Sequence, residues 1–207
     1  MRQRLLLALF GLGLALAAAQ AHAATPGDPF EPVNRKIFTS SMAAERKYFE
    51  PLAKLYHKLT PGALGDAIHN ALTNLGEPVV VINDLLQVRL GHALHDGERL
   101  IIDSTYGLGG LIDVGARVGL PHHDNDFGIT LGRWGVRPGP YLYLPILGPS
   151  TVRDAIGTGA DAAMNPLNFI RFDGRDSVEI GTSVAGAFDE QVREAPQLQV
   201  LLSGAAD

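Results

Sequence analysis

Apolar residues recur every three or four positions in several parts of this chain, which is the spacing of a helix with one apolar face. The clearest stripe contains Leu64, Ile68, Leu72 and Leu75, and another surrounds Phe188 near the end of the chain. Short runs rich in glycine and proline separate these segments. The pattern predicts helices over residues 34–59 with an interruption near Pro51, 60–75, 88–106, 151–164 and 174–196.

Local signals set the expected ends of these helices. Thr60-Pro61 is typical of a helix N-terminus, and Gly76-Glu77-Pro78 is expected to end the helix that begins there. Thr151 and Asp154 form a candidate capping box. Asn165-Pro166 is expected to stop the helix that follows it, because proline cannot continue a helix.

Four other segments carry different patterns. Residues 24–36 are predicted to be an extended arm, because prolines disfavour helix at the residue before them. Residues 79–82 are β-branched and suit a strand, whereas the leucines after them favour a helix, so both alternatives stay open. Glycines at 107–110 predict a turn into a second helical arm over 111–120. Residues 121–149 are predicted to be an irregular loop region rich in glycine, proline and aromatic side chains.

Composition narrows the class of protein. Hydrophobic residues make up 46% of the 207 residues and charged residues 19%, which is typical of a folded chain and excludes a disordered one. The sequence contains no cysteine, so disulfides, thiolate metal sites and a lipid-modified cysteine are excluded within it. The formal net charge of -5 argues against a nucleic-acid partner.

The beginning of the chain is typical of an export signal. Arg2 and Arg4 precede an uncharged apolar run from Leu5 to Ala19, and Ala21-His22-Ala23 has the small residues of a cleavage site. The run is shorter than the roughly 20 residues that a spanning helix needs. We therefore predict a cleaved signal peptide at 1–23 and a single domain at 24–207 that no plain helix anchors across a bilayer.

Possible reactive groups are few. His122-His123-Asp124-Asn125-Asp126 is the densest set of possible zinc ligands, but adjacent histidines do not easily face one metal ion, which favours a solvated loop. The glycines at 107–110 lack the Lys-Ser/Thr of a phosphate-binding loop. Ser104 and His95 lack a nucleophile elbow around the serine. No catalytic residue, cofactor or metal is predicted.

Asn83 and Asp84 interrupt an apolar run, and polar groups in such a position need partners. Two interpretations stay open. The pair is either buried and hydrogen-bonded, which the sequence slightly favours, or it lines the wall of a channel.

Four blocks between residues 28 and 157 carry distinctive motifs. The first is DPFEPVNR from residue 28, and the second is NLGEP from 74 followed by VINDLLQ from 81. The third is STYGLGGLIDV from 104, and the fourth consists of short motifs between Asp126 and Asp154. The most distinctive residues are Asp28, Pro29, Phe30, Glu31, Asn34, Arg35, Asn74, Glu77, Pro78, Asn83, Asp84, Asp126, Phe127, Gly128, Leu131, Gly132, Trp134, Gly135, Gly139, Pro140, Tyr141, Pro145, Gly148, Arg153 and Asp154. Together and in this order, the blocks resemble the MlaA/VacJ family of outer-membrane lipid-asymmetry proteins.

The resemblance implies an all-α fold whose amphipathic helices form a ring around a channel in the inner leaflet of the outer membrane. It implies that misplaced phospholipids leave the outer leaflet through this channel and pass to a periplasmic carrier protein. It also implies association with trimeric porins and no covalent chemistry. The candidate channel wall consists of Asp103, Gly107, Gly109, Gly110 and Asp113.

The sequence departs from the family pattern in places. The usual lipobox cysteine is missing, so attachment is expected to depend on amphipathic surfaces or a porin. Thr39-Ser40-Ser41-Met42 and Asp103 replace residues that are usual in the family, and the C-terminal segment is expected to be diverged.

These departures motivate an alternative, a soluble periplasmic interaction module with the same fold. A further alternative is a hydrolase that uses residues 122–126.

Overall fold

The first helices form one continuous run in the computed structural model of the chain, which describes residues 28–145, 147–169 and 173–204. Helix α2 spans Glu31–Ala44, the π-helical turn η1 spans Glu45–Phe49, and α3 spans Glu50–Leu59. The π turn lies directly before Pro51, whose ring prevents regular α-helical bonding to the preceding turn. The predicted interruption near Pro51 is confirmed, and it is the π-helical turn η1 between α2 and α3.

The predicted extended arm at residues 24–36 is wrong from Glu31 onward, where α2 begins. Pro32 lies in the first turn of α2, where a missing N–H removes no helical hydrogen bond. The side chain of Asp28 accepts a hydrogen bond from the Phe30 N–H at 3.0 Å just before the helix. Residues 24–27 and the predicted signal peptide at 1–23 lie outside the described residues.

Helix α4, Ala63–Leu86, is longer than predicted because it continues through Pro78. The predicted end at residues 76–78 is therefore wrong, and residues 79–82 are helical rather than a strand. Buried polar side chains after Pro78 pack against other elements, and this packing offsets the hydrogen bond that proline removes.

The predicted N-cap at Thr60 is also wrong. Gly62, with a φ of 55°, occupies the residue before α4. The hydroxyl of Thr60 instead donates to the carbonyl oxygen of Tyr56 at 2.8 Å, at the end of α3.

Helix α5, Leu90–Thr105, agrees with the prediction to within two residues and packs beside α4. The glycine turn follows it, as predicted. The expected helical arm at 111–120 is wrong, because only the short helix α6, Val114–Arg117, forms there. Asp103 contributes to this outcome, since its Oδ1 accepts hydrogen bonds from the N–H groups of Val114 and Gly115 at 2.8 Å each.

Residues 121–149 are more regular than predicted. Helix α7, Phe127–Arg133, begins where the side chain of Asp126 accepts from the Ile129 N–H at 2.7 Å. Strand β1, Tyr141–Leu144, pairs antiparallel with β2, Gly148–Thr151, in a small hairpin. The strands are short and the rest of the described chain is helix or connection, so the predicted helical class is confirmed.

The capping box is confirmed: Thr151 Oγ1 accepts from the Asp154 N–H at 3.3 Å, at the start of α8, Val152–Met164. Asn165 ends α8 and is followed by the 3-10 turn η2, Pro166–Asn168. The last helix, α9, spans Arg175–Gly204, so the predicted end near Pro196 is wrong.

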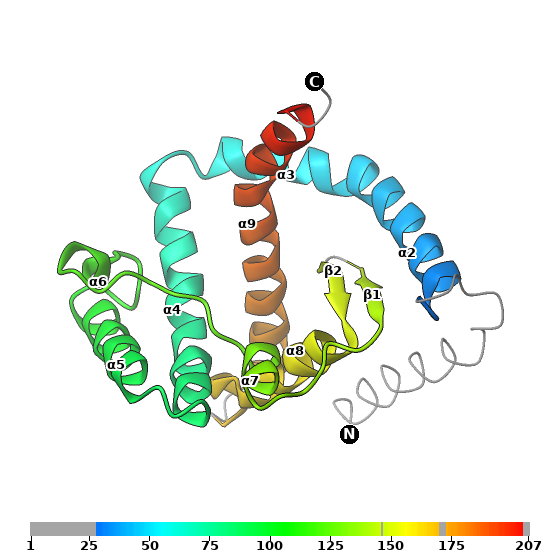
Figure 1. Cartoon of the computed structure of the whole chain (residues 1–207). Helices are drawn as coiled ribbons and strands as arrows, with labels where there is room; N and C mark the ends of the chain where they lie inside the picture. The colour runs from blue at the N-terminus through cyan, green and yellow to red at the C-terminus, as the bar shows by residue number, and fades with distance from the viewer. Residues whose placement is uncertain (1–27, 146, 170–172, 205–207) are drawn as a thin grey trace.

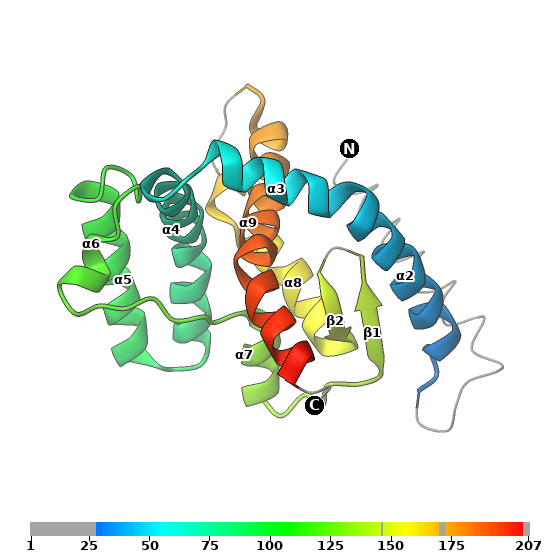
Figure 2. The same cartoon turned by 90° about the horizontal axis from the view of Figure 1, so that it is seen from above.

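Helix α9 runs through the middle of the molecule (Figure 1). Helices α4 and α5 lie on one side of it, and α8 and the hairpin lie on the other. Helices α2 and α3 form a long arch along one edge, which Figure 2 shows from above.

Buried side chains are mostly polar and many large hydrophobic side chains are exposed, which is the reverse of an ordinary soluble domain. We call this feature the inverted burial. Among the described residues, the buried hydrophobic side chains are only Val80, Ala93, Leu142, Ala155 and Val192. The buried polar or charged side chains are Asn34, Asn74, Glu77, Asn83, Asp84, Asp96, Arg99, Asp103, Asn125, Thr130 and Asp189. Many large hydrophobic side chains are exposed instead, so polar contacts hold much of the interior together.

Candidate functional site

Arg99 is the centre of one buried polar cluster, between α4, α5 and α6. Its Nε donates to Glu77 Oε1 at 2.8 Å, and its Nη1 donates to the Leu120 carbonyl oxygen at 2.8 Å. Nη1 also lies 3.0 Å from Asp113 Oδ1, and Nη2 lies 3.5 Å from Asp103 Oδ2. One arginine therefore connects three carboxylates from separate parts of the chain.

The charges in this cluster stabilise one another. Burial opposes the positive charge of Arg99, but its hydrogen bonds to Asp113 and Glu77 outweigh burial and raise the pKa of Arg99. Burial likewise opposes the charge of Asp113, but the bond to Arg99 lowers the pKa of Asp113. Both groups stay ionised at neutral pH.

Two of the five residues of the candidate channel wall, Asp103 and Asp113, belong to this cluster. Asp103 is buried against Arg99, and Asp113 caps α6 by accepting from the Ala116 N–H at 2.9 Å. A Cβ on Gly110 would lie 2.5 Å from the Cβ of Asn74, and one on Gly107 would lie 2.3 Å from the Ile112 carbonyl oxygen. These residues shape the turn and hold it against α4. A channel-wall role stays a prediction.

Gly109 differs from its neighbours because a Cβ there would meet nothing within 4 Å. Its φ of 76° is the reason that glycine suits this position. Tyr106 and Leu108 precede it and are exposed, so this turn offers apolar side chains to its surroundings.

Asn83 and Asp84 are fully buried and hydrogen-bonded, which confirms the first interpretation of that pair. Asn83 Nδ2 donates to Asp161 Oδ1 at 2.9 Å, and Asn83 Oδ1 accepts from the Thr130 hydroxyl at 2.8 Å. Asp84 Oδ1 accepts from Asn125 Nδ2 at 2.8 Å. These bonds connect α4 to α7 and α8.

The two adjacent histidines have different partners. His122 Nδ1 lies 2.8 Å from Glu77 Oε1, and this bond raises the pKa of His122. His123 Nδ1 lies 3.1 Å from Asp96 Oδ1. The expectation that they would not face one metal ion agrees with this geometry, but the segment is packed against α4 and α5 rather than freely solvated.

Several distinctive residues hold α7 against α8 and α4. A Cβ on Gly132 would lie 2.8 Å from Arg153 Nη1, and Arg153 Nε donates to Asp154 Oδ1 at 2.9 Å. The indole N–H of Trp134 donates to the Leu86 carbonyl oxygen at 3.3 Å. Residues of the fourth block therefore assemble around α7 and α8.

Sequence analysis missed a polar cluster on α9. Asp189, which is 2% exposed, accepts from the Tyr56 hydroxyl at 2.6 Å through Oδ1 and lies 2.7 Å from His69 Nδ1 through Oδ2. Arg193 Nε also donates to Asp189 Oδ2 at 3.3 Å. Nothing in the local sequence signals this cluster, because Tyr56 and His69 lie more than 100 residues before Asp189.

An apolar stripe runs along the outer face of η1 and α3, which we call the α3 stripe. It consists of Tyr48, Leu52, Leu55 and Leu59, whose helical spacing places them on one face. Their exposed fractions are 49–64%. Leu90, Leu94 and Ile101 form a similar exposed row on α5.

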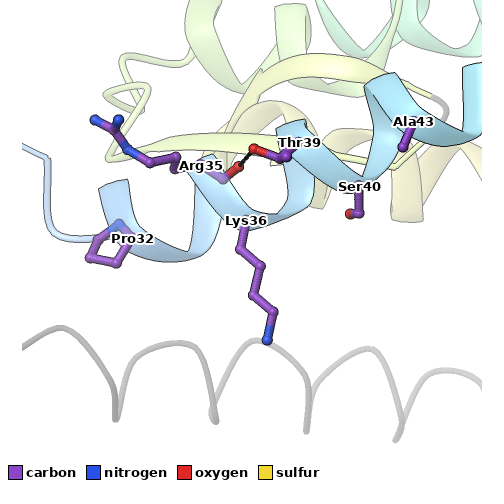
Figure 3. A pocket seen from close by; sticks show the side chains of 6 residues that line it. All are labelled: Pro32, Arg35, Lys36, Thr39, Ser40 and Ala43. Carbon is purple, nitrogen blue, oxygen red and sulfur yellow. Dashed lines mark hydrogen bonds between the residues drawn. The ribbon is translucent and has the colours of Figure 1, made fainter.

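A pocket of about 550 Å³ lies along α2 (Figure 3). Its lining residues are Pro32, Arg35, Lys36, Thr39, Ser40 and Ala43. All six come from a single helix and none is buried, so the pocket lacks the converging polar groups of a specific ligand site.

The described residues contain no helix with both the length and the hydropathy needed to cross a bilayer. The chain has rows of apolar side chains on its surface and clusters of charged side chains in its interior. It is therefore a helical protein of the class whose surfaces suit contact with lipid or another apolar partner. The chain belongs to the MlaA lipoprotein family, since the family model matches residues 26–207.

Comparison with individual proteins agrees with this assignment. The chain is 31% identical over 178 residues to the intermembrane phospholipid transport system lipoprotein MlaA of Shigella flexneri, covering 81% of this chain and 70% of that protein. It is 30% identical to the protein of the same name in Escherichia coli K12, with the same coverage. Both relatives are named as lipoproteins of an intermembrane phospholipid transport system.

Other relatives carry no functional name. An uncharacterized protein of Rickettsia prowazekii is 36% identical over 143 residues, or 69% of this chain, and the match spans 57% of that protein.

A solved structure described as "Structural basis for maintenance of bacterial outer membrane lipid asymmetry" matches with a TM-score of 0.72 and 28% identity. It covers 84% of this chain and 87% of the other, which confirms the fold.

Proposed function

We propose that this protein removes misplaced phospholipids from the outer leaflet of the outer membrane and passes them to a periplasmic carrier protein. The helices would lie in the inner leaflet, and the 103–113 segment would form part of the wall of a lipid channel. A trimeric porin is the proposed partner in the membrane. The proposal rests on family membership and on one structural observation, the inverted burial.

The exposed apolar rows support the membrane part of the proposal. Burying one leucine side chain is worth about 1.5–3 kcal/mol, so the α3 stripe can supply several kcal/mol of attachment to a lipid surface. The interior clusters keep the helices in register while their apolar faces contact lipid. A charged, hydrogen-bonded interior is stable in that position because its polar groups have partners.

Flotation of the purified full chain with phosphatidylcholine vesicles tests the membrane part. The double variant Leu52→Glu/Leu55→Glu changes the net charge by two units and puts carboxylates on the α3 stripe. We expect at least tenfold weaker binding than for the unaltered chain. The matched control is Lys54→Gln/Lys58→Gln, which changes the net charge by the same amount at exposed positions of the same helix and should bind within about twofold.

A transfer assay tests the transport part. The chain is reconstituted in vesicles with a fluorescent phospholipid, and extraction of that lipid by a purified periplasmic lipid carrier is measured. Transfer that depends on the protein supports the proposal. Firm vesicle binding without transfer contradicts transport, and absence of vesicle binding favours the alternative of a soluble interaction module.

A further inference from the structure

Three possible metal-binding side chains converge where α5 meets the segment before α7. His95, Asp96 and His123 each offer one donor atom, and these atoms all lie within 4.8 Å of one another. His95 Nδ1 lies 3.0 Å from Asp96 Oδ1, and His123 Nδ1 lies 3.1 Å from the same oxygen. Two imidazole nitrogens therefore face one carboxylate oxygen of a side chain that is fully buried.

The two distances to Asp96 Oδ1 are compatible with a tetrahedral zinc ion, and the third pair of donor atoms lies within 4.8 Å. With bonds of about 2.0–2.1 Å to nitrogen and oxygen, neighbouring ligand atoms of such a site lie about 3.3 Å apart. The observed separations of 3.0 and 3.1 Å are close to this spacing. Two histidines and one aspartate form a donor set that zinc accepts, with the fourth position left to water.

Asp84 provides a second, independent observation. Its Oδ2 lies 3.3 Å from His123 Nε2, and both atoms are buried without a hydrogen-bond partner. Asp84 is 0% exposed and is held by Asn125 and by Arg89, whose Nη1 lies 3.2 Å from Oδ1. If His123 binds a metal through Nδ1, its Nε2 carries the proton and lies 3.3 Å from the carboxylate oxygen of Asp84.

A carboxylate beside the second ring nitrogen is the arrangement from which many metal-binding histidines are oriented once the hydrogen bond forms. A metal ion would also offset the charge of the cluster. Asp84 and Asp96 are two fully buried carboxylates, and the permanent positive charge of Arg89 pairs with Asp84. Asp96 Oδ2 is a further buried oxygen without a hydrogen-bond partner. Such groups are costly to bury unless a partner balances them.

We propose that His95, Asp96 and His123 bind a zinc ion that fastens α5 to the segment before α7, with Asp84 positioning His123. The site is separate from the Arg99 cluster and does not depend on lipid transfer. The side chains of His95 and His123 are 29% and 26% exposed, so an ion can reach the site from solvent. Its role is to brace the fold.

Zinc titration of the full chain, purified without a histidine tag, tests the proposal. In competition with a chromophoric chelator, we expect one zinc ion per chain, and His95→Ala and His123→Ala should each weaken binding at least tenfold. Asp84→Asn should weaken it by about 10- to 100-fold, because the uncharged amide oxygen is a weaker acceptor for His123 than the carboxylate. His57→Ala is the matched control, because His57 is exposed and lies on α3, outside the cluster, and it should bind as the unaltered chain does.

Two further readouts remain decisive if an alanine variant does not fold. Cobalt bound to the unaltered chain should give the intense visible absorption of tetrahedral coordination, and zinc should raise its thermal unfolding midpoint. Stoichiometric binding that Asp84→Asn and the two histidine variants leave unchanged would overturn the site. An octahedral cobalt spectrum, or an unfolding midpoint that zinc does not move, would overturn it as well.

Discussion

Asn34 of α2 and Tyr141 of β1 are paired through the asparagine side chain, 107 residues apart in sequence. Asn34 Nδ2 donates to the Tyr141 carbonyl oxygen at 2.9 Å, and Asn34 Oδ1 accepts from the Tyr143 N–H at 2.9 Å. The side-chain amide thus satisfies the backbone of β1 as a neighbouring strand would. Asn34 and Tyr141 both belong to the distinctive motifs, and together they fix the arch of α2 to the hairpin.

Replacing Asn34 by alanine should loosen this attachment. The change removes two hydrogen bonds and leaves a carbonyl and an N–H of β1 without their partner, which should lower the free energy of unfolding by about 2–3 kcal/mol. Hydrogen exchange should become faster in the first turns of α2. Ser40→Ala on the exposed face of the same helix is the control and should change stability by less than about 0.5 kcal/mol. Equal exchange in the two variants would contradict the attachment.

Alanine at Gly110 should be more damaging than alanine at Gly109. Both glycines have positive φ, at 90° and 76°, so either substitution strains the backbone. Only Gly110 packs closely, since its added Cβ would lie 2.5 Å from the Cβ of Asn74. We expect G110A to cost about 1–3 kcal/mol more than G109A in the free energy of unfolding measured by urea titration. Equal costs would mean that the turn does not pack against α4.

The crossing of α7 and α8 predicts opposite signs for two similar substitutions. A Cβ on Gly157 would lie 2.4 Å from the Gly128 backbone nitrogen, whereas one on Gly159 would meet nothing within 4 Å. Gly157→Ala should therefore force the helices apart and lower the thermal unfolding midpoint. Gly159→Ala should raise the free energy of unfolding by about 0.5–1 kcal/mol, because alanine is the better helix former. A midpoint for Gly157→Ala at or above that of the unaltered chain would disprove the close crossing.

Sequence alone is sufficient for the features that local chemistry controls. The capping box at Thr151, the stop at Asn165-Pro166 and the α5 helix depend on neighbouring residues, and the sequence predicts them within a few positions. The predicted helix end at Pro78 is wrong because the packing of α4 outweighs the local tendency of proline to break a helix. The helical fold class can be predicted from the apolar periodicity, because that periodicity is a property of the sequence and does not depend on tertiary contacts.

The buried polar clusters could not be predicted from the sequence, because only the fold brings their members together. Glu77 and Arg99 lie on different helices, and only the fold brings them within 2.8 Å. Asp189 meets Tyr56 across 133 positions and carries no local signal at all. An apolar stripe shows which face of a helix is apolar, but not whether that face meets the interior or lipid. The α3 stripe is therefore recognisable as helical from the sequence but not as exposed.

The ion pair of Asp113 and Arg99 predicts how stability depends on pH. Because the folded-state pKa of Asp113 is lowered, its contribution is fully present well above its unfolded pKa and is lost as pH falls through the lower, folded value. Asp113→Asn removes the charge but keeps a good N-cap for α6. At pH 7 the variant should be less stable by about 1–2 kcal/mol, which is below the roughly 1.5–3 kcal/mol of a hydrogen bond to a charged group because Asp113 is 29% exposed.

The difference between Asp113→Asn and the unaltered chain should stay constant from about pH 7 to about pH 5. It should then shrink as pH falls below the ordinary aspartate pKa of about 3.9, since the unaltered chain loses the same charge there. Urea titrations at several pH values measure both free energies of unfolding. Glu98→Gln is the control, because Glu98 is exposed on α5 and the loss of its charge should leave little difference at any pH. A gap at Asp113 that persists unchanged at acid pH would mean that the asparagine disturbs α6 itself rather than the charge pair.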